Sequence, residues 1–280
     1  MTREKSTKVI KQASIICWAF LLLMLATPFL SKAQDSTFHY LAQIPVQANF
    51  FTTDNLKQVY VVSHKNELIK YNSQLEEVFR FSNNTLGQLT YVDVTNPFNI
   101  LLYYPDFRAL ITLDRTLNKT GEFDLFDLDI EEVKAVALSN DNNIWLYDDV
   151  TFKIKKINRQ GKKLVESDNL SFLLGHTISP NFILEKANKL YVNSPEHGVL
   201  IFDLFGRYQH TLSIKGLERF QIEGGHLVYY QAEQLFSFHL KSLLTKSSNI
   251  PHPEKGIGAL HIQRATLYLQ REKQIELYRF

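Results

Sequence analysis

The chain has 280 residues, of which 45% are hydrophobic and 21% are charged. This balance is typical of globular proteins and excludes a disordered or fibrous chain. The formal net charge is +2 at pH 7, too small for the basic surface that nucleic-acid-binding domains usually carry. The length is sufficient for one large domain or two small ones.

Residues 1–33 have the three parts of an export signal. Four positive charges and one negative charge lie in the first twelve residues, and an apolar run follows at 13–30. The run ends in Ser-Lys-Ala, the small-residue pattern that signal peptidase accommodates, so we predict cleavage after Ala33 and a mature chain of residues 34–280 with no membrane span. An uncleaved anchor helix is the alternative, because the apolar run is just long enough to cross a bilayer.

Removing the signal changes the charge and the chemistry of the chain. The signal holds five of the 31 basic residues and one of the 29 acidic residues, which leaves 26 basic and 28 acidic residues. A nucleic-acid partner is therefore not expected. The single cysteine, Cys17, and both methionines also lie in the signal, so the mature chain has no residue for thiolate catalysis, disulfides or cysteine-ligated zinc.

A repeat of about 41 residues runs through the rest of the sequence. Six short runs rich in aromatic and β-branched residues recur at spacings of 37 to 46 residues, at 58–63, 99–104, 143–148, 189–194, 226–231 and 266–271. A strand is expected before each run and another after it, and the second of these leads into an outer strand. Turns such as Asn158–Gly161 and Asp203–Gly206 fit the last connection, because the first side chain can bond its own turn and glycine adopts the positive φ.

Four strands repeated six times predict an all-β fold, a six-bladed β-propeller with four-stranded blades over residues 34–280. The sixth repeat contains only three strands before Phe280, while residues 37–46 form one extra strand at the start. We expect this N-terminal strand to join the last blade, which closes the ring and removes an exposed sheet edge.

Two segments resemble the repeats of NHL or TolB-like six-bladed propellers. They are NNIWLYDDVTFKIKKINRQGKKL at 142–164 and NKLYVNSPEHGVLIFDLFGRYQHTL at 188–212. Asp148 falls near the turn aspartate of the family, but Lys153 and Val199 stand where an Asn-Arg pair is common. The resemblance implies a fold and no single function, since such propellers include scaffolds, ligand-binding modules and some enzymes.

An outer-membrane β-barrel is a competing interpretation, because an exported chain that ends in Phe280 with Tyr278 is similar to the last strand of such barrels. Barrel strands need about 9 to 11 residues with an unbroken outward apolar row. Most strands expected here are about six residues long, and Gln274 and Glu276 interrupt that row. The strand lengths favour the propeller.

The candidate binding residues lie in loops that a propeller gathers on one face. Asp127, Asp129 and Glu131 alternate with apolar residues, which would place three carboxylates on one side if this stretch were extended. Oxygen ligands of this kind suit Ca²⁺ or another divalent ion, or a basic partner, although the same residues also fit a solvated acidic loop. The full set of candidates is Asp106, Phe107, Asp124, Asp127, Asp129, Glu131, Asp148, His64 and His197.

The histidines give a weaker indication of a metal site. His64 and His197 occupy similar loops three blades apart, too far for one ion unless long loops fold inward, and no His-x-x-x-His spacing occurs. We assign no cofactor and no catalytic residue, because nucleophile elbows and phosphate-binding glycine loops are also missing.

We therefore predict a monomeric, exported, non-enzymatic propeller that binds an envelope protein partner in the periplasm or at the outer membrane. A propeller hydrolase or lyase with a divalent metal in its central channel is the alternative.

Overall fold

The computed structural model describes residues 38–280. The predicted signal peptide and its cleavage site lie outside the described residues. Within the described part, no helix is long and apolar enough to cross a membrane.

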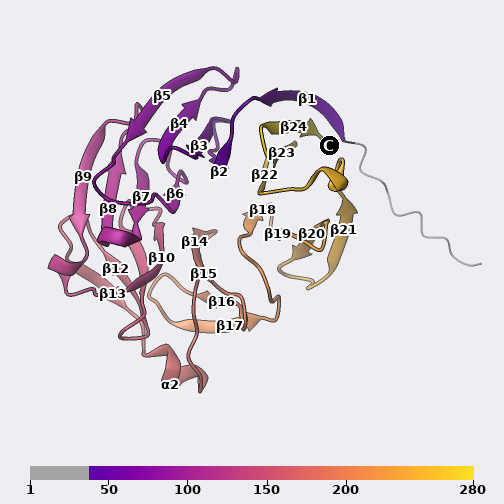
Figure 1. Ribbon diagram of the computed structural model, residues 1–280. Helices are drawn as coiled ribbons and strands as arrows, with labels where there is room; N and C mark the ends of the chain where they lie inside the picture. Colours follow the sequence, from indigo (N-terminus) through magenta and orange to yellow (C-terminus); the bar gives the residue numbers. More distant parts are fainter. Residues whose placement is uncertain (1–37) are drawn as a thin grey trace, which may run out of the picture. The chain divides into compact units, whose positions relative to one another are not determined.

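Six separate four-stranded antiparallel sheets make up the fold, and they follow one another around a ring (Figure 1). The first three blades contain β2 (Ala48–Thr53), β3 (Val59–Ser63), β4 (Glu67–Tyr71), β5 (Glu77–Ser82), β6 (Tyr91–Asp93), β7 (Ile100–Tyr104), β8 (Ala109–Leu113), β9 (Lys119–Asp124), β10 (Val133–Leu138), β11 (Ile144–Asp148), β12 (Lys153–Ile157) and β13 (Lys163–Glu166). The last three contain β14 (Phe182–Lys186), β15 (Lys189–Ser194), β16 (Gly198–Phe202), β17 (Tyr208–Leu212), β18 (Gln221–Glu223), β19 (His226–Gln231), β20 (Gln234–His239), β21 (Thr245–Asn249), β22 (Leu260–Gln263), β23 (Thr266–Gln270), β24 (Ile275–Arg279) and β1 (His39–Ile44).

The predicted six-bladed propeller is confirmed, including four strands in every blade. Within residues 38–280, helical structure is confined to short segments in the loops, namely η1 (Pro105–Phe107), η2 (Phe126–Leu128), α2 (Leu170–Leu174) and η3 (Pro253–Lys255). The competing interpretation of a membrane barrel is wrong, because the strands form six separate sheets and do not join into one continuous sheet.

The N-terminal strand closes the ring as expected. β1 pairs antiparallel with β24, from His39 opposite Arg279 to Ile44 opposite Ile275. Ile44 is 2% exposed and packs in a cluster with Ile275 and Leu277. The last blade is thus built from both ends of the described chain, and the edge that β24 would otherwise expose is paired.

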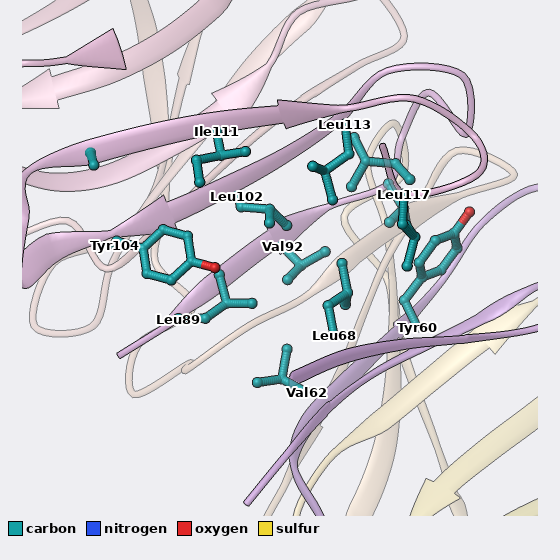
Figure 2. Packing of buried hydrophobic residues seen from close by; sticks show 13 residues of the cluster. Tyr60, Val62, Leu68, Leu89, Val92, Leu102, Tyr104, Ile111, Leu113 and Leu117 are labelled. Carbon is teal, nitrogen blue, oxygen red and sulfur yellow. The ribbon is translucent and has the colours of Figure 1, made fainter. Parts of the chain in front are cut away.

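The core lies between the blades, because each middle strand is covered on both faces. β3, β7, β8, β11 and β16 are buried along their whole length, which explains why they read as continuous apolar runs with little polar alternation. Figure 2 shows the packing between the first two blades, where Tyr60, Val62 and Leu68 meet Val92 and Leu102.

Buried and partly buried polar side chains link neighbouring blades. The Asp93 carboxylate accepts a hydrogen bond from the backbone N–H of Leu138 at 2.8 Å. Further links are made by Lys70 to Arg115, Glu185 to Ser139 and Trp145, Asn193 to Leu217, Gln221 to Ile262, and Gln270 to Ala48. Every pair of adjacent blades therefore has at least one polar link as well as its apolar core.

The turns before the outer strands form as the sequence predicts. Asn158 Oδ1 accepts the backbone N–H of Gln160 and Lys162, both at 2.9 Å, and Gly161 has φ 75°. The equivalent turn at Asp114 has Leu117 at φ 62°, so the hydrogen bonds of the first side chain define this turn even where no glycine is available.

Deleting residues 34–46 should destabilise the whole domain, because β24 then loses its partner and the cluster around Ile44 opens. The point variant Ile44→Ala should lower the free energy of unfolding by about 2–5 kcal/mol, the usual cost of truncating a buried isoleucine. Leu41→Ala is the matched control on the same strand, since Leu41 is 42% exposed. Urea unfolding measures both variants. If the melting temperature of the deletion variant lies within a degree or two of that of the mature chain, the closure is contradicted.

Candidate functional site

The loops of the propeller lie on two faces. One face carries the loop between the second and third strands of each blade and the connections between blades, and we call it the loop face. Its connections include 83–90, 125–132 and 213–220. The opposite face carries the remaining tight turns, such as Asn158–Gly161.

A cavity of about 710 Å³ opens where the loop face meets the central channel. Its wall comes from the inner strands of the second, third and fourth blades, with Tyr91 and Phe182 among the residues that line it, and Arg219 joins them from the fifth blade. Asp106 and Glu131 lie at its margin on loops. The volume is within the range of roughly 300–1,000 Å³ that ligand pockets usually have.

Arg219 reaches across the channel to three other blades. Its guanidinium carbon lies 5.4 Å from the ring centre of Phe50, 5.3 Å from Tyr91 and 5.8 Å from Phe182. These are cation–π distances. Burial among the channel walls lowers the pKa of Arg219 from its ordinary value, yet its side chain stays accessible to solvent. An arginine remains charged at neutral pH, so the channel holds a fixed positive charge.

No ion pair or hydrogen bond among residues 38–280 involves the guanidinium of Arg219. Asp93, a carboxylate near it, instead accepts the backbone N–H of Thr95 and of Leu138, each at 2.8 Å. Glu218 is adjacent in sequence and exposed. Within this part of the chain, the five N–H donors of Arg219 have no protein acceptor and can bind water or a ligand.

His261 lies farther along the same channel, on the inner strand of the sixth blade. Its Nδ1 is 2.6 Å from the hydroxyl of Thr53, and the Gln221 amide also contacts its ring. Burial, together with the nearby charge of Arg219, lowers the pKa of His261 to about 3. The imidazole is neutral at physiological pH and a weak general base.

Asp106, one of the sequence candidates, lies at the margin of the cavity. Its carboxylate accepts the backbone N–H of Gln88 at 2.9 Å. The loop can approach this closely because Gly87 has φ 75°, and a Cβ there would lie 2.2 Å from the carboxylate oxygen. Phe107 follows at 57% exposure.

The acidic connection of 124–132 differs from the extended form considered above. The Asp124 carboxylate accepts the backbone N–H of Phe126 at 2.9 Å, which starts the η2 turn. Asp129 then has φ 55°, and Leu125 and Ile130 are buried. The side chains of Asp127, Asp129 and Glu131 are exposed, but strand alternation does not align them. The reason is that the chain bends at the η2 turn, which buries Leu125 and Ile130 on either side of it.

Asp148 is placed inside its blade. The side chain is 2% exposed and forms a 2.5 Å ion pair with Lys155, and it accepts the backbone N–H of Val150 and Thr151. Burial alone would raise the pKa of Asp148, but the hydrogen bonds from Lys155 and Thr151 outweigh it and lower the pKa. The geometry gives Asp148 a structural role in the loop.

The candidate histidines do not form one site. His64 is exposed on its loop, whereas His197 stacks on His176 with ring centres 4.2 Å apart. No group of three or more His, Cys, Asp or Glu side chains in residues 38–280 is arranged to hold a metal ion. A Ca²⁺ or other divalent site remains a prediction from the sequence.

Exposed apolar side chains gather on the loop face around the second, third and fourth blades. Phe126 is 58% exposed, with the Arg108 guanidinium 4.9 Å above its ring, and Phe172 is 86% exposed. The others on this face are Phe107, Val150 and Leu173. Exposed aromatic rings on a loop face are typical of a binding surface.

Arg219 and its three rings were not among the candidates predicted from the sequence. The available signal was the arginine directly before the buried Phe220, at the start of the inner strand of the fifth blade. From the sequence alone, such a residue is expected at the mouth of the channel. The sequence does not show that rings from three other blades surround it.

Comparison with known proteins supports the architecture. No family model and no curated protein matches the chain. Among solved structures, the virginiamycin B lyase of Staphylococcus aureus has a TM-score of 0.62 at 11% identity and covers 87% of this chain and 100% of its own. A streptogramin B lyase has a TM-score of 0.58 at 15% identity, covering 87% of this chain and 86% of its own.

The Pan2 WD40 domain of Neurospora crassa is also similar, with a TM-score of 0.61 at 10% identity over 90% of this chain and 97% of its own. At these identities the likeness concerns the fold alone. It confirms the propeller architecture that the repeats predicted.

Replacing Asp148 by Asn should destabilise the protein at pH 7 by about 3–5 kcal/mol, because Lys155 is left without its buried partner. A carboxyl with a lowered folded pKa stabilises the fold above its unfolded pKa, and that contribution is lost as the pH falls through the folded pKa. The difference between wild type and Asp148→Asn should therefore shrink as the pH falls below the ordinary aspartate range. Urea unfolding from pH 7 to pH 2.5 measures it.

Asp149→Asn is the matched control. The Asp149 carboxylate is 3.6 Å from Lys134 and partly exposed, so its loss should cost less than about 1 kcal/mol. Equal effects of the two variants at pH 7 would contradict the structural role of Asp148.

Proposed function

We propose that the mature chain is an exported, non-enzymatic binding module of the cell envelope that meets a protein partner through the loop face. The observation that carries the proposal is the combination of five exposed apolar side chains with the cavity at the channel mouth, all on one face. A rigid ring that presents loops in this way positions contacts without having to order them on binding.

Export is supported by the sequence of residues 1–33, whose charged, apolar and small-residue parts are those of a cleaved signal. Placement in the periplasm or at the outer membrane is part of the proposal.

A hydrolase or lyase is the second candidate, because two of the similar structures are lyases. It has less support from the residues of this chain. His261 is the histidine that lies in the channel, and at a pKa of about 3 it accepts protons poorly at neutral pH. A metal-assisted reaction would also need a set of ligands for the ion. The described residues contain no group of three or more His, Cys, Asp or Glu side chains that could hold one.

Charge reversal tests the loop face as the binding surface. Asp127→Lys together with Asp129→Lys should weaken capture of the partner several-fold, and more strongly at low salt, because charge complementarity acts mainly on encounter. The full chain, tagged at its C-terminus, is crosslinked in whole cells before the envelope is fractionated and its captured proteins are quantified. Both aspartates are exposed, so folding should be unchanged.

The matched control reverses two lysines on the outer edge of the third blade, Lys162→Glu with Lys163→Glu, which should leave capture unchanged. Loss of capture in the lysine variant alone would move the binding surface to the outer edge of the blade. Recovery of the chain in the cytosol with residues 1–33 retained would contradict export.

A further inference from the structure

The cavity is lined by side chains of both charges. Arg219 supplies a positive charge inside the channel, and Asp106, Glu131 and Glu132 supply carboxylates where the cavity opens on the loop face. Two other cations line the cavity, but each has a neighbour. Lys134 forms an ion pair with Glu132 and lies 3.6 Å from Asp149, and Arg108 lies over the Phe126 ring.

Arg219 is arranged to receive an anion. Its guanidinium lies within cation–π distance of the rings of Phe50, Tyr91 and Phe182, and its N–H donors have no acceptor among residues 38–280. A guanidinium pairs most strongly with a carboxylate or phosphate, through two parallel N–H···O bonds. Beside three aromatic rings such a pair is less screened, and therefore stronger, than on an open surface.

The charge at the margin determines which anion fits. Glu132 is paired with Lys134, whereas Asp106 and Glu131 have no ion-pair partner among residues 38–280, and their charges would repel a doubly charged phosphate or a polyanion. A single carboxylate matches the one guanidinium of Arg219, and positive groups behind that carboxylate would meet Asp106 and Glu131. The walls formed by Tyr91 and Phe182 favour an apolar or aromatic group directly beside it.

From this arrangement we propose that the cavity binds the C-terminal carboxylate of a partner protein whose last residues include lysine or arginine, with the terminal carboxylate on Arg219. The inference rests on the proposed function and names the partner's chemistry. A chain end fits better than a side-chain carboxylate on a folded surface, because it can enter a pocket at the centre of a ring of loops. The cavity volume of about 710 Å³ accommodates several residues of such an end.

Two synthetic peptides of sequence Lys-Ala-Arg-Ala-Phe test the proposal, one with a free C-terminal carboxylate and one amidated. Isothermal titration with the mature chain should show the free acid binding at least tenfold more tightly than the amide. Arg219→Gln should abolish this preference. Arg264→Gln should retain it, because Arg264 is an exposed arginine in a tight turn on the opposite face.

The variant Arg219→Lys keeps the test valid if Arg219→Gln fails to fold. Lysine keeps the positive charge but cannot form two parallel N–H···O bonds with a carboxylate. This variant should bind the free acid with intermediate affinity. Circular dichroism and thermal unfolding establish that each variant is folded. A purely structural role for Arg219 would change the melting temperature of the variants and leave the ratio between acid and amide unchanged.

Four outcomes would overturn the inference. The acid and the amide could bind equally, or neither could bind. A peptide with glutamates in place of the basic residues could bind as well as the original, which would remove the basic segment from the proposal. Benzoate alone could bind as tightly as the peptide acid, which would indicate a small-molecule site. Equal binding of acid and amide that is weakened by Asp127→Lys with Asp129→Lys would overturn the carboxylate site and leave the proposed function intact.

Discussion

The pairing of β1 with β24 is the contact on which the rest of this molecule depends. It joins residues from the two ends of the described chain into one sheet and removes the free edge of the last blade. With the ring closed, the sixth blade also meets the first, through Gln270 bonded to the carbonyl of Ala48 and through His261 beside Thr53. The positions of all six inner strands, and hence the shape of the channel, follow from this closure.

Closure also explains how a charged side chain can occupy the channel. Bringing an unpaired guanidinium fully into a protein interior costs several kcal/mol. Arg219 avoids most of this cost, because it keeps contact with solvent and because three rings each contribute about 0.5–2 kcal/mol of cation–π attraction. Those rings come from three different blades, so an open or shifted ring would separate them. The binding chemistry proposed for the channel mouth is thus a consequence of the architecture.

Much of the fold was predictable from the sequence because its signals are local. Middle strands such as β3, β7 and β8 are continuous apolar runs covered on both faces, and turns such as Asn158–Gly161 carry their own hydrogen-bonding side chain. Predictions within single loops were less accurate. The carboxylates of Asp127, Asp129 and Glu131 would share one side of an extended strand. The chain instead bends into the η2 turn, where the Asp124 carboxylate accepts the backbone N–H of Phe126.

The centre of the candidate site was not predictable, because it depends on contacts between distant parts of the chain. Phe50, Tyr91 and Phe182 each appear in the sequence as an ordinary strand aromatic, and Arg219 appears as a loop residue. Only the ring brings the four together. The same reasoning separates Asp148 from the other acidic candidates, since its burial against Lys155 depends on the pairing of β11 with β12.

We infer that the closed ring holds the Arg219 guanidinium at the mouth of the channel, without an acceptor among residues 38–280, and that ligands bind there. The most direct measurement is a nuclear magnetic resonance titration of the ¹⁵N-labelled mature chain with the free-acid peptide, following the side-chain Nε–H of Arg219 and the backbone amides. The account predicts that Arg219, Tyr91 and Phe182 shift together while β13 and the turns of the opposite face do not. Shifts confined to β13 or to those turns, with Arg219 unaffected, would contradict it.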